Sequence, residues 1–215
     1  MGIKETLGAL LRRPDRNPVI AEGKKSPEIS LEQDWQRQAD KLAGLYAEEL
    51  KFGTHEAYIA SLPKFEPQPE QFKRRFDIPV IVETRVPLKR MLKLAGIVTY
   101  FDVDSIKDWD EGEFKTPSTP YTAWVNDGTS NLNKSVKAVR ESLKSDERGA
   151  NIYEVIVLYL RDPKILNHHY LDVPGSRVDS DDAPSLHRWV GRPGLYRSFV
   201  DVALPRYGSV VAGKI

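Results

Sequence analysis

The stretch NIYEVIVLYLRDP, from Asn151 to Pro163, decides how the second half of the chain is interpreted. Its apolar and β-branched residues suit a buried strand, and periodicity alone leaves that alternative open. Asn151 and Glu154, however, have the spacing of a helix cap pair, and Asp162-Pro163 is a typical helix end. We therefore predict a buried helix over residues 152–160.

Strand and helix signals alternate on both sides of this segment. Short apolar, β-branched runs indicate strands. Pro87 suits the first turn of a helix, and Gly96 suits the position just after its end. The predicted strands are residues 79–82, 97–101, 121–125, 186–190, 197–204 and 209–211. The predicted helices outside 152–160 are residues 88–94 and 134–143. Turns are expected at residues 174–176 and 180–182, so the C-terminal part is rich in loops.

The N-terminal part reads as helical. Ser30 and Gln33 form a capping-box pattern, and apolar residues then recur at helical spacing as far as Leu50. Thr54 caps a second helix that ends before Pro63. We predict an α+β (mixed α/β) fold, with N-terminal helices packed on a mixed sheet. We expect residues 30–215 to form one domain, behind a flexible arm of residues 1–29 in which residues 2–13 have the spacing of a short amphipathic helix.

The composition of the chain excludes several classes of function. The chain has 32 Lys and Arg against 31 Asp and Glu, so no global field draws it to nucleic acid or to a membrane. It has no Cys, which excludes disulfides, thiolate zinc sites and a cysteine nucleophile. No apolar run approaches the ~20 residues of a membrane span, and the first residues lack a signal-peptide core. We expect a cytoplasmic protein that needs no cofactor and does not enter a membrane.

The most metal-like segment is residues 168–172, with His168, His169 and Asp172. Imidazole and carboxylate groups are suitable metal ligands, and a metal-assisted hydrolase is one alternative function. Adjacent histidines point in different directions, however, and the sequence has no pair of histidines four residues apart on a helix. We prefer a polar helix end, where a histidine interacts favourably with the helix dipole.

The sequence Pro174-Gly175-Ser176-Arg177 is a second candidate site. The backbone N–H groups and hydroxyl of Ser176 suit an anion, which Arg177 would bind bidentately. The alternative is a tight turn in which Arg177 pairs with a carboxylate of this chain. We favour the structural role, and no nucleophile-elbow or phosphate-loop pattern accompanies the motif.

The C-terminal segment interleaves arginines with aromatic residues, among them Arg188, Trp189 and Arg192. Positive charge combined with stacking side chains is typical of RNA or single-strand binding. The alternative is a small sheet with its aromatic residues inward and its arginines in solvent. The near-zero charge of the whole chain favours this alternative.

Residues 76–215 as a whole resemble an uncharacterised bacterial domain family of unknown function. The resemblance rests on a strand at 121–125, the Arg148-Gly149 turn before the helix with Glu154, the Gly175-Ser176-Arg177 loop and Ala183-Pro184-Ser185-Leu186. The family has tryptophans close to the C-terminus, whereas this chain has Tyr207 there. The resemblance implies a compact mixed domain and no particular chemistry.

Because no catalytic pattern outweighs its structural alternative, our leading hypothesis is a non-enzymatic binding or protein-interaction protein. The N-terminal arm and the C-terminal segment are the expected contacts with a protein partner. The metal-assisted hydrolase and the RNA-binding protein are the alternatives.

Overall fold

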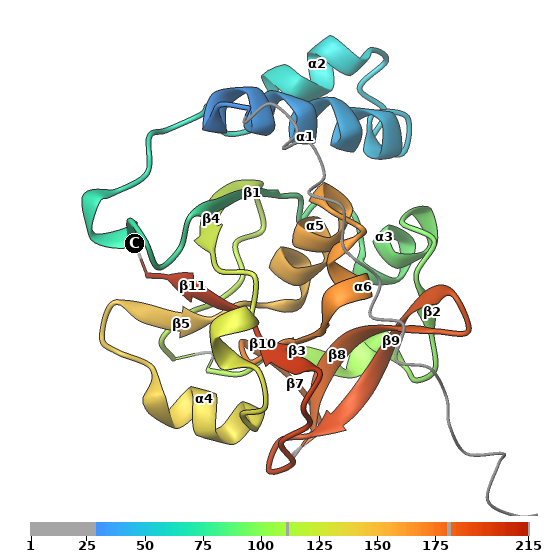
Figure 1. Ribbon diagram of the computed structural model, residues 1–215. Helices are drawn as coiled ribbons and strands as arrows, with labels where there is room; N and C mark the ends of the chain where they lie inside the picture. The colour runs from blue at the N-terminus through green and yellow to red at the C-terminus, as the bar shows by residue number, and fades with distance from the viewer. Residues whose placement is uncertain (1–28, 111, 180–181, 215) are drawn as a thin grey trace, which may run out of the picture.

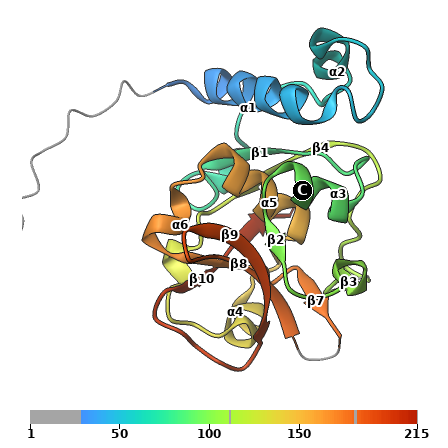
Figure 2. The same cartoon turned by 90° about the vertical axis from the view of Figure 1, so that its right-hand side faces the viewer.

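The computed structural model describes residues 29–110, 112–179 and 182–214. Helices α1 and α2 lie above strand β1 in both views, and two β-sheets with their covering helices make up the rest (Figures 1 and 2). The predicted α+β class is therefore confirmed. The predicted arm, with its helix at residues 2–13, lies outside the described residues except for Ile29.

Helix α1, Leu31–Tyr46, begins with the predicted capping box between Ser30 and Gln33. It is shorter than expected because residues 47–50 form turns. Helix α2, His55–Ala60, follows, capped by the hydroxyl of Thr54. Buried Gln38 joins α1 to strand β1, Ile78–Val82, because its amide donates to the Pro79 carbonyl at 2.8 Å and accepts from the Ile81 N–H at 3.3 Å. The outer edge of β1 is thus covered by α1.

The first sheet has the order β1-β4-β11-β5. Strand β4 is Tyr121–Val125, β11 is Val211–Gly213 and β5 is Glu147–Gly149. All its pairs are antiparallel. The C-terminal strand β11 therefore lies between two strands from the middle of the chain, and β5 forms the second edge.

The second sheet has the path β10-β6-β8-β7-β3, and β9 joins β8 to β2. The pairs β10–β6 and β2–β9 are parallel and the others are antiparallel, so the sheet is mixed as predicted. Its strands are β2 Val98–Thr99, β3 Ile106–Asp108, β6 Tyr170–Asp172, β7 Ser176–Val178, β8 Asp182–Trp189, β9 Arg192–Phe199 and β10 Tyr207–Ser209.

Residues 152–161 are a helix, α5 (Ile152–Arg161), which confirms the choice made for the ambiguous segment. Its capping box joins Asn151 and Glu154, and its buried face packs against β1. One cluster of buried apolar residues extends from α1 through β1 and α5 to Leu186 and Leu195 of the second sheet. The remaining helices are α3 Leu88–Leu94, α4 Val136–Ser142 and α6 Ile165–His168, with 3-10 turns η1 Glu70–Phe72, η2 Val103–Ser105 and η3 Thr129–Asn131.

Several sequence-based boundaries were wrong. The strand expected over residues 97–101 is limited to β2, and the strand expected over 197–204 is part of β9, which starts at Arg192. A two-residue turn at Val190 and Gly191, both with positive φ, fixes the register of the β8–β9 hairpin and so places β9 earlier.

The strand expected over residues 186–190 is the end of β8, which begins at Asp182, and the one expected over 209–211 is divided between β10 and β11. The turn expected over residues 174–176 ends in strand β7, because Ser176 pairs with Asp108 of β3.

The described helices are too short and too polar for one of them to cross a membrane.

Candidate functional site

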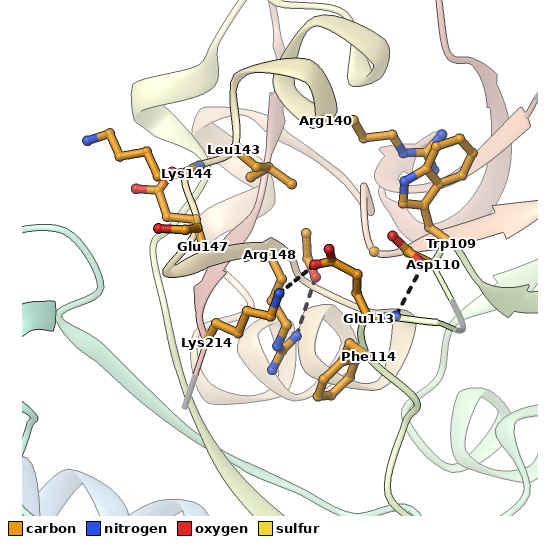
Figure 3. A pocket seen from close by; sticks show the side chains of 13 residues that line it. Trp109, Asp110, Glu113, Phe114, Arg140, Leu143, Lys144, Glu147, Arg148 and Lys214 are labelled. Atoms are coloured by element: carbon orange, nitrogen blue, oxygen red, sulfur yellow. Dashed lines mark hydrogen bonds and ion pairs between the residues drawn. The ribbon is translucent and has the colours of Figure 1, made fainter.

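The candidate functional site is a pocket of about 390 Å³ beside α4 and β5, in which charged and aromatic side chains meet (Figure 3). Its walls come from the segment after β3, the end of α4, strand β5, the turn before β7 and the residue after β11. These parts are far apart in sequence and meet only in the folded chain. The pocket combines aromatic side chains with several cations.

Arg140, from the last turn of α4, is the central cation of this pocket. Its guanidinium carbon lies 3.6 Å from the centre of the Trp109 ring, so the two planes stack. Its Nε donates to the Pro174 carbonyl at 2.9 Å and its Nη2 to the Ser176 carbonyl at 2.8 Å. These bonds hold the guanidinium in one orientation against the turn before β7.

Arg140 is half-buried and is not paired with any carboxylate of the described residues. Burial lowers the pKa of Arg140 to about 10, so the group is still a cation at neutral pH. Backbone carbonyls and an aromatic face compensate only part of the lost hydration of a charged group. Arg140 therefore contributes a positive charge that no salt bridge among the described residues neutralises, while Asp110 also lines the pocket.

A second arginine, Arg148 of β5, lies at the floor of the pocket, where it forms an ion pair with Glu154 that has no net charge. It donates to both carboxylate oxygens of buried Glu154, at 2.8 and 2.5 Å, and stacks on Phe114 at 3.8 Å. Glu154 also accepts from the Tyr121 hydroxyl at 2.9 Å and from the Asn151 N–H at 2.8 Å. Because both charged groups have hydrogen-bond partners of opposite charge, this network holds the floor of the pocket in place and adds no unpaired charge to it.

The rim of the pocket carries further charges. Lys214 pairs with Glu113 (Figure 3). Glu147 pairs with Arg75 at 2.9 Å. Asp110 accepts from the N–H groups of residues 112 and 113. Lys144 is exposed just beyond the end of α4 and forms no salt bridge among the described residues, but it lies near enough to Asp146 to help lower the pKa of that carboxyl group. Arg140 is therefore the cation of the pocket lining that faces no carboxylate partner among the described residues.

The loop at Gly175 and Ser176 has its polar groups bonded within the chain. Gly175 N–H donates to the Ala150 carbonyl, and Ser176 N–H donates to the Val173 carbonyl. The Ser176 hydroxyl is buried and accepts from Ile152 N–H at 3.0 Å, at the start of α5. These bonds fit the structural role that we favoured from the sequence over an anion-binding cradle. Arg177 lies in β7 opposite Lys107, and its proposed role remains a prediction.

The candidate residues of the C-terminal segment lie on the β8–β9 hairpin. Trp189 and Arg192 are cross-strand neighbours and exposed, whereas Arg188 follows core residue Leu186 on the other face of β8. Arg197 also lies away from that pair and binds Asp179 at 2.9 Å. The hairpin therefore distributes its arginines over two faces, and a nucleic-acid role for the segment remains a prediction.

The aromatic residues of the second sheet form a row across its strands. Tyr207, Tyr170 and His187 are in register on β10, β6 and β8, and Tyr196 of β9 lies 3.8 Å from His187, ring centre to ring centre. A side chain at Gly194 would collide with the Tyr196 ring, so this glycine gives the ring its space. The rings pack against one another in tilted and edge-to-face arrangements, and this packing accounts for the spacing of these aromatic residues in the sequence.

The three predicted metal-site residues are separated by the end of α6. His168 is exposed, whereas His169 is buried with its Nε2 2.7 Å from the Asp127 carbonyl oxygen. Asp172 lies on β6 with its carboxyl group buried, and burial raises the pKa of Asp172 to about 7. In residues 29–110, 112–179 and 182–214, no group of three His, Asp or Glu side chains converges as a metal site would require.

Comparison with known proteins gives no relative. No family model, no curated protein and no solved structure matches this chain. The resemblance of residues 76–215 to a bacterial domain family therefore remains an expectation, and the functional argument rests on the geometry of the site.

Sequence reasoning did not identify Arg140, Trp109 or Lys144 as site residues. Trp109 belongs to an acidic loop and Arg140 to the polar side of an ordinary amphipathic helix. Only indirect features of the sequence pointed to this pocket. Gly149 and Gly175 both line it. The buried cap residue Glu154 requires a cation as its partner, which is Arg148.

Proposed function

We propose that the protein is a non-enzymatic binding protein whose pocket beside α4 and β5 holds an anionic group, a carboxylate or a phosphate. The observation that carries the proposal is the uncompensated cation Arg140, fixed by two backbone carbonyls and by the face of Trp109. An arginine held in one orientation loses little entropy when it binds a planar or tetrahedral anion.

The surroundings of Arg140 favour an anion over other ligands. Lys144 follows the end of α4, past the extended residue Leu143, and adds a second positive charge to the lining of the pocket. Trp109 is 43% exposed, so it offers apolar surface to the part of a ligand that carries the anion. A pocket of about 390 Å³ whose lining combines the rings of Trp109 and Phe114 with charged side chains is of the size that small ligands occupy.

Binding is favoured over catalysis because the glutamates around the pocket are already paired with cations, and Asp110 accepts from two backbone N–H groups. Glu113 pairs with Lys214, Glu147 with Arg75, and Glu154 with Arg148. A general base needs a carboxylate or imidazole within reach of the substrate and ready to accept a proton. The pocket offers fixed positive charge instead, which is suited to holding an anion.

Isothermal titration calorimetry with inorganic phosphate and with glutarate tests the proposal and distinguishes the two anions. We expect one of them to bind with a Kd below about 1 mM, or about −4 kcal/mol. Lys144→Gln is the main variant, because Lys144 holds no protein group in place. We expect it to weaken binding about 3- to 10-fold, as the loss of one exposed charge does.

Arg140→Lys is the second variant, and we expect it to remove binding because an ammonium has neither the plane nor the fork of the guanidinium. Its unfolding midpoint must be measured, because Arg140 also ties α4 to the turn before β7. Lys93, an exposed lysine on α3, provides the matched control, and Lys93→Gln should leave the affinity for both anions unchanged. Binding that is equal in Lys144→Gln, Arg140→Lys and Lys93→Gln, or no binding of either anion, would overturn the proposal.

A further inference from the structure

We infer that one face of the second sheet binds single-stranded nucleic acid, because exposed aromatic rings lie there beside arginines that pair with no carboxylate of the described residues. We call it the aromatic face. It is defined by Tyr100, Tyr170, His187, Trp189, Tyr196 and Tyr207. None of these residues lines the anion pocket, so the inference goes beyond the proposed function and is tested separately.

The two faces of the β8–β9 hairpin have different surroundings. Leu186 and its cross-strand partner Leu195 are buried in the main apolar cluster and mark the inner face. Side chains alternate between the faces along a strand, so every second residue counted from His187 belongs to the opposite, aromatic face. The hairpin residues of that face are Ser185, His187, Trp189, Arg192, Gly194 and Tyr196.

Two rings of the aromatic face are largely open to solvent. Trp189 is 64% exposed and makes no ring contact among the described residues. Tyr100 follows β2, which lies beside β9 (Figure 2), and is 62% exposed. It stacks on Tyr196 with ring centres 4.7 Å apart and 20° between the planes, and Tyr196 in turn lies against His187. A ring that is already held in place loses little entropy when a second planar group stacks on it.

Two arginines border these rings. Arg192 is exposed and is the cross-strand neighbour of Trp189. Arg206 is exposed, and its guanidinium carbon lies 4.6 Å from the centre of the Tyr170 ring. Within residues 29–110, 112–179 and 182–214, neither arginine forms a salt bridge, whereas Arg197 on the inner side pairs with Asp179. The aromatic face therefore has one cation near Tyr170 and another beside Trp189.

Acidic groups are few beside these arginines. No Asp or Glu occurs from residue 183 to residue 200, and Asp201 pairs with Lys137 at 3.1 Å. Asp172 belongs to the same face, but its carboxyl group is buried. Asp102, two residues beyond Tyr100, is exposed and accepts from the Asp104 N–H at 3.2 Å. We therefore expect the phosphates of a bound strand beside Arg192 and Arg206, and only a base at Tyr100.

This combination suits a single strand better than a duplex. Unpaired bases stack on aromatic side chains that a sheet exposes, and arginines bind the phosphates between them. The bases of a duplex are stacked on one another and offer no free plane to Trp189 or Tyr100. The near-zero charge of the whole chain does not oppose binding, because exposed charges more than about 10 Å apart are largely screened from one another at 0.1 M salt.

Fluorescence anisotropy tests the inference with the full chain and fluorescein-labelled 12-nucleotide oligo-dT and oligo-U. We expect a Kd of about 1–100 µM, the range typical of binding without sequence preference. Tighter binding of oligo-U would identify RNA as the ligand through its 2′-hydroxyl groups, and tighter binding of oligo-dT would identify DNA. An abasic 12-mer keeps the phosphates and lacks the bases. We expect it, and a 12-base-pair duplex, to bind at least about 5-fold more weakly.

The variants Trp189→Ala and Trp189→Phe test the stacking contact. We expect Trp189→Ala to weaken the oligonucleotide at least about 5-fold, and Trp189→Phe, which keeps a ring, to stay within about 3-fold of wild type. Phe199→Ala is the matched control. Phe199 is 72% exposed on the same hairpin but alternates with Tyr196, so it belongs to the other face. Phe199→Ala should leave the affinity unchanged.

The variant pair Arg192→Gln and Arg197→Gln tests the phosphate contact. Both are exposed arginines of β9, but Arg197 lies on the inner side and pairs with Asp179. The logarithm of the binding constant falls linearly with the logarithm of the salt concentration, with a slope of about −0.7 for each phosphate contact to a single strand. Arg192→Gln should therefore make this slope shallower by about 0.7, and Arg197→Gln should not change it.

Competition separates this site from the anion pocket. Saturating glutarate at constant ionic strength should leave the oligonucleotide bound. If glutarate displaces the oligonucleotide, the strand lies in the pocket and the inference is wrong. If neither oligonucleotide binds, the inference also fails, whereas the proposed function is still decided by phosphate and glutarate.

Three further results would contradict the inference. The first is equal affinity of the abasic and the base-bearing strands, and the second is equal affinity of Trp189→Ala and Phe199→Ala. The third is Trp189-dependent sedimentation with vesicles of phosphatidylserine and phosphatidylcholine in the absence of oligonucleotide binding. That result would assign the aromatic face to a lipid surface.

Discussion

Gly149 and Gly175 touch backbone to backbone beside the charged pocket. A Cβ atom on Gly175 would lie 2.3 Å from the Gly149 carbonyl oxygen, and one on Gly149 would lie 2.4 Å from the Gly175 nitrogen. Neither residue has a positive φ, so close approach, and not backbone conformation, requires glycine here. This contact brings strand β5 against the turn before β7, which Arg140 also holds.

Gly175→Ala should therefore destabilise the protein by at least about 2 kcal/mol, because backbone atoms must move to admit the methyl group. Gly44→Ala is the control, since no atom lies within 4 Å of its Cβ position in α1. That change should stabilise the chain by about 0.5–1 kcal/mol, as alanine does in a helix. Urea unfolding measures both. Equal stability of Gly175→Ala and wild type would show that the contact is not close-packed.

The β8–β9 hairpin contains a strained residue at its tip. Val190 has φ 48° and Gly191 has φ 80°, and Val190 is 87% exposed. Positive φ is costly for a β-branched residue, whereas Asn followed by Gly is preferred in such a turn. Val190→Asn should raise the free energy of unfolding by about 1 kcal/mol. Lower stability of Val190→Asn, measured by thermal unfolding beside the exposed control Val202→Asn, would contradict the turn geometry.

Asp172 should make stability depend on pH. Its carboxyl group faces the cross-strand partners Ser185 and Ser209, its Oδ1 has no hydrogen-bond partner, and burial raises the pKa of Asp172 from 3.8 to about 7. The folded chain keeps a proton that the unfolded chain releases. The folded state therefore loses stability as pH rises from about 4 to 7, and the loss reaches about 4 kcal/mol above that range.

Asp172→Asn removes this ionisation, so the variant should be more stable than wild type at pH 8 and close to it at pH 4. Urea unfolding at both pH values tests the difference, with the exposed Asp201→Asn as control. Burial lowers the pKa of His187, on the same sheet face, to about 4. His187 is therefore neutral at pH 8 and about half protonated at pH 4, so the comparison of Asp172→Asn with wild type is made at the same pH in each case. A stability difference between Asp172→Asn and wild type that is the same at pH 4 and pH 8 would show that the carboxyl group is solvated.

Zinc should not stabilise the protein through residues 168–172. His169 holds the Asp127 carbonyl, His168 is exposed and the Asp172 carboxyl group is buried in the sheet. A site filled at 100 times its Kd would add about 2.7 kcal/mol. We expect no change in Tm with added zinc. A rise of several degrees that disappears in His169→Ala would restore the metal site and the hydrolase alternative.

The elements that sequence predicted well are those specified by neighbours along the chain. The capping boxes Ser30 with Gln33 and Asn151 with Glu154 start α1 and α5 as expected, because both partners lie within one helical turn. Strands β1 and β4 follow from their own apolar runs. Short strands such as β5 and β7 were missed, because each is held by partners distant in sequence and has little propensity of its own.

The sequence alone thus determined the class of the fold, its two capped helices and the lack of any cysteine chemistry. Only the tertiary structure decided the site. Trp109 and Arg140 are 31 positions apart, Gly149 and Gly175 are 26 apart, and Lys214 reaches Glu113 from the last strand. Such contacts depend on which strands pair and in which register, and no local pattern encodes that choice. That Arg140 pairs with no carboxylate of residues 29–110, 112–179 and 182–214 is visible only in the folded chain.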